Sequence, residues 1–147
     1  MFRSMLLFAG VSAFLDGHAS QAVENGILTA AELMLVDLEH TELVVLSACV
    51  TLRGETTRGN VRGLSSALTQ AGAKTAVLSL WPVPDEMTQI LMDNFYRYLL
   101  QGTDRAEALR QAKLDLRSEG AGVGDWAAFS CLGKPGPLPP QVLVEFS

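Results

Sequence analysis

The apolar run from Leu43 to Cys49, Leu-Val-Val-Leu-Ser-Ala-Cys, constrains the fold more than any other stretch of the chain. Its aliphatic and β-branched residues do not alternate with polar ones, which is typical of a strand buried on both faces of a mostly parallel sheet. In open α/β sheets, ligands and catalytic groups gather at the carboxyl ends of the strands. Cys49 ends this strand and precedes the polar, glycine-containing segment 51–63. It is therefore the first candidate for chemistry.

The rest of the chain alternates between strand and helix patterns. Further strands are predicted at residues 5–10, 76–81 and 126–132. Helices are predicted at about 30–37, 61–71, 85–101 and 104–116, with capping signals at Thr29 with Glu32, at Asp104 with Glu107 and at Gly72. Strands that alternate with helices imply right-handed crossovers and a parallel sheet. The expected fold class is α/β.

Composition limits the classes of function. The 147 residues are 48% hydrophobic, enough for the core of one domain, and the formal charge of -5 argues against nucleic acid or an anionic membrane surface as a partner. No segment reaches the roughly 20 apolar residues of a membrane helix. A signal peptide is the alternative interpretation of the apolar segment 1–15, but Gly10 and Ser12 interrupt its apolar run.

Cysteine content and loop patterns narrow the chemistry further. Two cysteines, Cys49 and Cys131, are too few for a disulfide scaffold, so a reducing cytoplasm is the expected compartment. No strand–loop junction carries a glycine-rich phosphate fingerprint, and neither a cofactor nor a metal is expected. Four of the six prolines lie in 135–140, so residues 134–147 are interpreted as a proline-rich extended tail that follows a domain at 1–133.

Six blocks of sequence follow one another in a recognisable order: 25–32, 43–49, Gly63-Leu64 with Ala71-Gly72-Ala73, 79–83 with Asp85-Glu86, 106–112 and 126–129. Together they resemble CHAT domains, which are caspase-like cysteine peptidase domains related to separases and often attached to tetratricopeptide repeats. The similarity covers about residues 5–133. The resemblance implies a caspase-like, mostly parallel sheet flanked by helices, and a cysteine–histidine dyad.

The resemblance implies that Cys49 is the nucleophile. A thiol becomes a strong nucleophile only as the thiolate, so it needs an imidazole or another cation nearby. The alternative is that Cys49 is a small buried hydrophobic residue, as strand cysteines commonly are. Cys131 matches no motif residue of the family and is assigned to the core.

The sequence departs from the family at the base and beside the nucleophile. The family histidine lies in a His-Gly motif upstream of the strand that residues 5–10 resemble, and the sequence has no such motif, so the N-terminal strands are expected to be missing. His40 cannot replace it, because nine mostly extended residues separate it from Cys49 by roughly 25–30 Å. His18 lies in a predicted loop and is more simply a solvated residue. Val50-Thr51-Leu52 replaces the usual Glu-Thr-Gly, which weakens an oxyanion hole.

Asp85 and Trp81 match, by position, the substrate pocket of separase-like relatives. A carboxylate at Asp85 would select a substrate Arg or Lys at P1 through a charge-assisted pair, or would simply stabilise a helix start. Trp81 would line that pocket or fill the core. The arginines of the loop after Cys49, which are Arg53, Arg58 and Arg62, are interpreted as solvated, with partner docking as the alternative.

Loss of the histidine-bearing strand would leave the 43–48 strand at an edge of the sheet, where its free backbone groups are available to pair with another chain. Two hypotheses follow. The chain is the nucleophile-bearing portion of a cysteine endopeptidase, inactive alone and completed by a His-bearing chain or segment or by self-association. Alternatively, it is an inactive remnant that serves as a protein-interaction module through its edge and its proline-rich tail.

Overall fold

The computed structural model describes residues 5–7, 26–47 and 58–144 of the chain. The elements follow one another as β1 (Met5–Leu7), β2 (Ile27–Thr29), α2 (Ala30–Leu33), β3 (Val44–Leu46), α3 (Arg58–Gln70), β4 (Thr75–Ser79), α4 (Asp85–Leu100), α5 (Arg105–Ser118), α6 (Val123–Trp126), β5 (Phe129–Gly133) and α7 (Pro140–Val144).

The main sheet has three strands in the order β3-β4-β5. β3 runs parallel to β4, with Val44 opposite Ala76, and β5 runs antiparallel to β4, with Phe129 opposite Ser79. The α/β class predicted from the sequence is confirmed. The sheet, which was expected to be mostly parallel, is mixed, because β3 and β4 pair in parallel and β4 and β5 pair antiparallel. Two long helices, α4 and α5, and the short helix α6 connect β4 to β5, so the chain returns to the end of the sheet that it left and enters β5 in the opposite direction.

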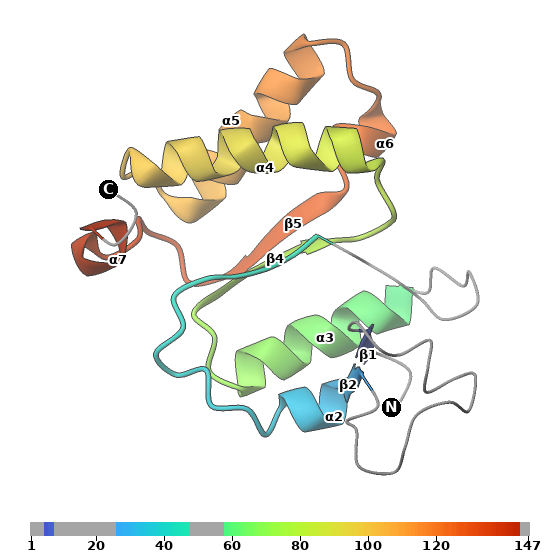
Figure 1. Ribbon diagram of the computed structural model, residues 1–147, viewed down its shortest axis with the longest axis vertical. Coiled ribbons are helices and arrows are strands. Elements are labelled where there is room, and N and C mark those ends of the chain that lie inside the picture. The colour runs from blue at the N-terminus through green and yellow to red at the C-terminus, as the bar shows by residue number, and fades with distance from the viewer. Residues whose placement is uncertain (1–4, 8–25, 48–57, 145–147) are drawn as a thin grey trace.

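Helices cover both faces of this sheet. Figure 1 shows α4 and α5 on one side and α3 with α2 on the other. Side chains of β4 alternate between the two layers. Val77 joins the core under α4 and α5, which includes Phe95 and Leu116, whereas Ala76 and Leu78 join the core of α2 and α3. All five residues of β4 are buried, so β4 is the strand covered on both faces.

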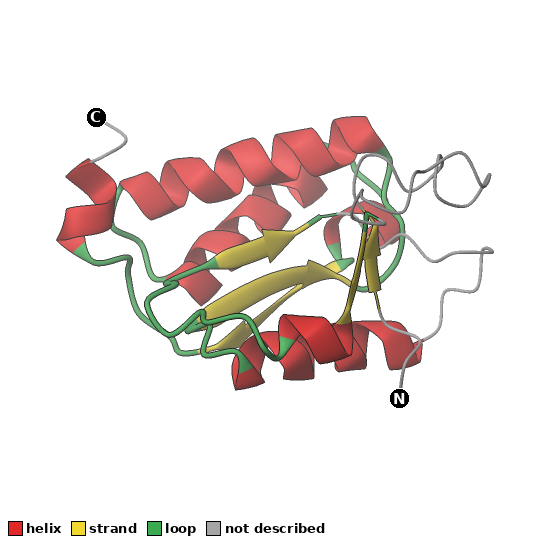
Figure 2. Ribbon diagram, turned by 60° about the horizontal axis from the view of Figure 1, so that its bottom comes forward, coloured by secondary structure: helices red, strands yellow, loops and turns green. Residues whose placement is uncertain are grey.

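β3 is less buried than its sequence predicts. Val44, Val45 and Leu46 are all only half-buried. Within the described residues β3 pairs with β4 alone and stands at one edge of the sheet. A second, two-stranded sheet is formed by β1 and β2, which pair antiparallel with Leu6 opposite Leu28, and Figure 2 shows it beside the main sheet. The sequence did not predict β2.

Two of the predicted helix starts have their capping residues in place. The Thr29 hydroxyl accepts a hydrogen bond from the Glu32 amide at 3.2 Å, and the Glu32 carboxylate accepts one from the Thr29 amide at 2.8 Å, which confirms the capping box. Asp104 accepts from the amide of Ala106 at 2.8 Å and caps α5. Glu107 does not return the interaction: it pairs with Arg110, and its hydrogen bonds to Arg110 and Gln111 lower its pKa to about 2.

The predicted boundaries near the C-terminus need correction. The apolar run that starts at Trp126 was predicted as a strand from its first residue, but α6 includes Trp126 and β5 begins only at Phe129. The proline-rich segment is not a free extended linker, because Leu138 is 9% exposed and belongs to the core under α4 and α5. A short helix, α7, begins at Pro140, since proline is favoured in the first helical turn.

Among the residues that the structure describes, no helix has the length and apolar character required to cross a lipid bilayer.

Candidate functional site at the carboxyl end of the sheet

The parallel strands β3 and β4 end side by side. Leu46 is opposite Leu78, and one residue further along each strand the Ser79 hydroxyl donates a hydrogen bond to the Ser47 carbonyl at 3.3 Å. This bond fixes the exits of the two strands relative to each other. Cys49, the predicted nucleophile, follows Ser47 by two residues and lies outside the described residues, as do His18 and Arg53.

Trp81 follows the end of β4 and anchors that exit to α6. Its indole Nε1 donates a hydrogen bond to the carbonyl of Gly124 at 2.7 Å, and its half-buried ring packs against the core under α4 and α5. Both sequence interpretations of Trp81 placed it near this end of the sheet. The packing supports its role as a core residue, and the position beside the strand exits keeps it among the candidates for a pocket wall.

Asp85 is the first residue of α4 and is exposed. The cap position of this helix is occupied by Pro84, which has no side-chain hydrogen bond to the helix. Within the described part of the chain, no hydrogen bond or ion pair of the Asp85 carboxylate is found. Its charge still complements the positive end of the α4 dipole, but the carboxylate has free acceptor sites for a ligand.

The remaining predicted residues do not join this site. His40 is exposed in the turn before β3, at the opposite end of the strand from Ser47. Cys131 is a half-buried free cysteine in the middle of β5, opposite Val77, and burial raises the pKa of its thiol. A raised pKa keeps the thiol protonated near neutral pH, which makes Cys131 a poor nucleophile. Arg62 is exposed on α3.

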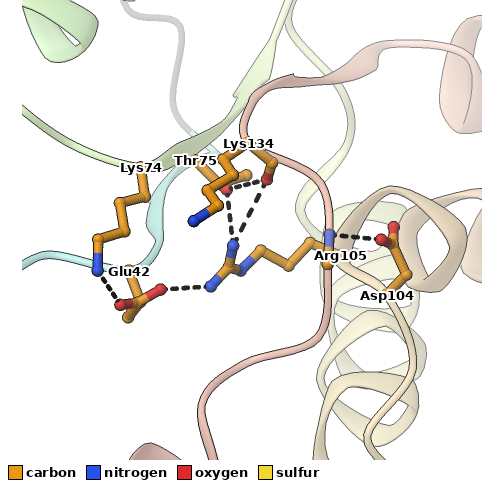
Figure 3. A network of polar contacts seen from close by, with 7 residues as sticks. Glu42, Lys74, Thr75, Asp104, Arg105 and Lys134 are labelled. Atoms are coloured by element: carbon orange, nitrogen blue, oxygen red, sulfur yellow. Dashed lines mark hydrogen bonds and ion pairs between the residues drawn. The ribbon is translucent and has the colours of Figure 1, made fainter.

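A network of buried polar contacts at the amino end of the sheet was not predicted (Figure 3). Arg105, 2% exposed, pairs with Glu42 at 2.5 Å through Nη2. Its Nη1 donates to the Thr75 hydroxyl at 3.3 Å and to the Lys134 carbonyl at 3.5 Å. Lys74 also pairs with Glu42. These contacts join the starts of β3, β4 and α5 to the end of β5.

The positive charges of Lys74 and Arg105 change the pKa of Glu42. The hydrogen bond from Lys74, followed by the fields of Lys74 and Arg105, lowers the pKa of Glu42. The Arg105 Nε has no hydrogen-bond partner among the described residues. The available sequence signals for this network were two polar residues, Thr75 and Glu42, that lie beside apolar strands. Arg105 is 63 positions from Glu42 in the sequence, and no local pattern connects these two residues.

A groove of about 600 Å³ lies beside the free edge of β3. Most of its walls are apolar. It is lined by His40, Glu42, Leu43, Val45, Tyr96, Leu99, Leu100, Leu138 and Val142. The groove therefore runs between the edge strand, α4 and the C-terminal segment. In the described ranges, no group of three or more His, Cys, Asp or Glu residues is arranged to hold a metal ion.

Comparison with known proteins identifies the family. The sequence pattern of the CHAT domain matches residues 3–134. Tetratricopeptide repeat protein 28 of mouse is 32% identical over 127 residues, which cover 81% of this chain and 5% of that protein, and the human protein of the same name matches to the same extent. No solved structure matches significantly.

The chain belongs to the CHAT domain family, a caspase-like family, as its sequence blocks indicated. It spans about 5% of the length of the tetratricopeptide repeat proteins that it matches. Its relatives are thus much longer proteins, named for repeats that typically form extended binding surfaces.

Proposed function

We propose that this chain is the nucleophile-bearing portion of a caspase-like cysteine endopeptidase of the CHAT family. In this proposal Cys49 attacks the scissile carbonyl as the thiolate, Asp85 selects Arg or Lys at P1, and Trp81 forms part of the pocket wall. The imidazole that takes the thiol proton comes from another segment or chain. The setting is cytoplasmic, and neither cofactor nor metal takes part.

The observation that carries the proposal is the shared exit of β3 and β4. The Ser79–Ser47 hydrogen bond holds these exits together, and Cys49 follows Ser47 by two residues in the sequence. Trp81 and Asp85 leave β4 at the same end. The free, exposed carboxylate of Asp85 suits a charge-assisted pair with a basic substrate side chain better than a buried or paired one would.

The base must be supplied from elsewhere because His40 lies at the wrong end of β3. A general base has to be within hydrogen-bond reach of the proton that it removes, about 2.6–3.2 Å. His40 is separated from Ser47 by the full length of the strand. Thiol deprotonation at Cys49 would therefore need an imidazole carried by a partner, which fits the expectation that the isolated chain is inactive.

The edge of β3 offers a place for such a partner. One side of β3 has no strand beside it within the described ranges, and the apolar groove runs along that edge. An added strand would satisfy the free backbone groups of β3 and place alternate side chains in the groove. The partner in this proposal is a His-bearing strand, from another protein or from a second copy of this chain.

Labelling with a peptidyl acyloxymethyl ketone that carries Arg at P1 tests the proposal. Intact-mass spectrometry should show no adduct on the isolated chain and one adduct when a chain with a His-Gly segment is co-expressed. Cys49→Ala should abolish the adduct, and Cys131→Ala should retain it. Asp85→Asn should slow labelling by the P1 Arg reagent at least about tenfold, which corresponds to about 1.4 kcal/mol, without slowing a P1 norleucine reagent.

The second candidate is an inactive protein-interaction module, favoured by the free edge and apolar groove of β3. A tetratricopeptide repeat protein is the partner that the family suggests. Absence of any Cys49 adduct with or without the His-bearing chain would favour this module over the peptidase. The proline-rich tail is a weaker docking motif than its sequence implies, because Leu138 is buried.

A further inference from the structure

A second hollow, of about 440 Å³, lies where the start of α4 meets the end of α5. Its volume is within the range of ligand-binding pockets, about 300–1,000 Å³. Met87 and Ile90 line it from α4, Pro84 lines it from the cap position before α4, and Leu116 lines it from α5. The hollow thus has an apolar wall on two helices that are joined by the shared core.

The other wall of this hollow is acidic. Glu119 and Asp125 line it, separated by the segment Gly120–Gly122. Asp125 accepts a hydrogen bond from the Gly122 amide at 3.1 Å through one carboxylate oxygen, Oδ2, so the position of its side chain is fixed. Glu119 is exposed, and its carboxylate has no hydrogen bond or ion pair within the described ranges.

The helices add to the negative field of the hollow. Glu119 is the C-cap of the 14-residue helix α5, and the negative end of a helix dipole favours a cation there. Asp85 and Glu86 counter the positive end of α4 in its first turn. The nearest basic side chain of α5, Arg117, is held over the ring of Trp126 at 5.9 Å from the ring centroid.

We infer that this hollow binds a Lys or Arg side chain from an extended, part-apolar peptide segment of a partner protein. The aliphatic stem of the bound side chain packs on Met87, Ile90 and Leu116, and its cationic end meets Glu119 and Asp125. Long basic side chains bind in this way because their stems are apolar and only their ends need polar partners. Charge complementarity selects this occupant over an apolar or acidic segment.

Among the described residues, neither Trp81 nor Asp85 lines the hollow, so the inference does not depend on peptidase activity. It does lie at the end of the sheet where β4 exits, since Trp81 is bonded to Gly124 within the adjacent α6. A basic segment docked here would bring the rest of its chain close to the proposed cysteine site.

Fluorescence anisotropy with a labelled peptide of alternating Leu and Arg tests the inference on the full chain. A citrulline peptide keeps the shape of arginine without its charge, and a peptide with Ser for Leu keeps the charge without the apolar neighbours. The Leu-Arg peptide should bind at least about tenfold more tightly than either, a difference of about 1.4 kcal/mol.

Variants locate the binding site. Glu119→Gln should weaken binding about two- to fivefold, as expected for a partly exposed ion pair, and Met87→Gln should weaken it by removing apolar contact at similar side-chain length. Asp93→Asn removes an exposed charge elsewhere on α4 and should have no effect. Backbone amide NMR shifts should change most at Gly120 and Gly122.

Three results would overturn the inference: no binding of the Leu-Arg peptide, equal binding of the citrulline peptide, or equal weakening by Asp93→Asn and Glu119→Gln. Failure of the peptidase proposal would leave all of these measurements unchanged, so the two proposals are tested separately.

Discussion

The two ends of the same sheet are built differently. At the amino end, Glu42, Thr75 and Arg105 are joined by side-chain contacts, and Arg105 is almost completely buried. At the carboxyl end, one side-chain hydrogen bond joins the strand exits in the part of the chain that the structure describes, from Ser79 to Ser47, and Asp85 is exposed. One end therefore has its polar groups engaged with one another, and the other has polar groups available for ligands.

This difference separates stability from function within one sheet. Polar contacts at the amino end hold β3, β4, β5 and α5 in register. The carboxyl end can then keep exposed groups without losing the arrangement of the strands. Parallel strands place their exits at one end of a sheet, which is the general reason that sites are found there. Variants at each end test whether this division holds.

The largest expected effect is that of Arg105→Met at the amino end. The variant removes an almost completely buried guanidinium from the Glu42 carboxylate, which then keeps Lys74 as a partner, and it removes the contacts of that guanidinium with Thr75. We expect the free energy of unfolding to fall by about 3 kcal/mol. Urea unfolding followed by the fluorescence of Trp81 and Trp126 measures this loss. If Arg105→Met lowers the free energy of unfolding by less than Thr75→Val does, the contacts of Arg105 do not stabilise the amino end of the sheet as proposed.

Thr75→Val should have the second-largest effect. Valine matches the shape of threonine but cannot donate to the Lys134 carbonyl, 2.8 Å away, or accept from Arg105. Because Thr75 and Arg105 are both buried, we expect a loss of about 2 kcal/mol in the same urea assay. A change within error would contradict the proposed role of the network.

Acid should weaken the amino end through Glu42. Its pKa is lowered in the folded state, so its contribution to stability is complete above its ordinary value of 4.5 and is lost as the pH falls through the lowered pKa. Glu42→Gln should therefore flatten the decline of unfolding free energy measured by urea titrations below pH 4.5.

Glu107→Gln is the comparison variant for this measurement, because the pKa of Glu107 is lowered to about 2 on the exposed surface of α5. A decline that is unchanged in Glu42→Gln but removed in Glu107→Gln would assign the acid sensitivity to the surface of α5 instead.

The smallest effect is expected for Ser79→Ala at the carboxyl end. It removes one 3.3 Å hydrogen bond from a buried serine hydroxyl and should lower the unfolding free energy by about 0.5 kcal/mol. Ser79 and Thr75 stand at opposite ends of β4, so the pair is a matched comparison. If Ser79→Ala lowers the unfolding free energy as much as Thr75→Val does, the side-chain contacts at the carboxyl end stabilise the sheet as much as those at the amino end.

Much of the local structure could be predicted because its signals are local. The Thr29–Glu32 capping box needs residues three apart, and the buried strand β4 is evident from its apolar run. The strand direction of β5 could not be predicted in this way. It depends on α4 and α5 packing as a pair, and nothing in the run from Trp126 to Cys131 records that contact.

The candidate site was predicted in part. Trp81 and Asp85 do leave β4 at the end where Ser79 bonds to Ser47. The role of Cys49 stays a prediction. The Glu42–Arg105 pair and the acidic hollow at Glu119 were missed, because each joins side chains from segments far apart in the chain.

The sequence by itself determined the family, the α/β class and most of the helices and strands, since these depend on short patterns and on ordered blocks of residues. The edge position of β3, seen within the described residues, was expected from the family resemblance, whereas the tertiary structure alone decided that β5 is antiparallel and that Leu138 is buried. The physical reason is range: propensities and caps act over a few residues, whereas strand order, burial and ion pairing are set by surfaces that meet only after the chain has folded.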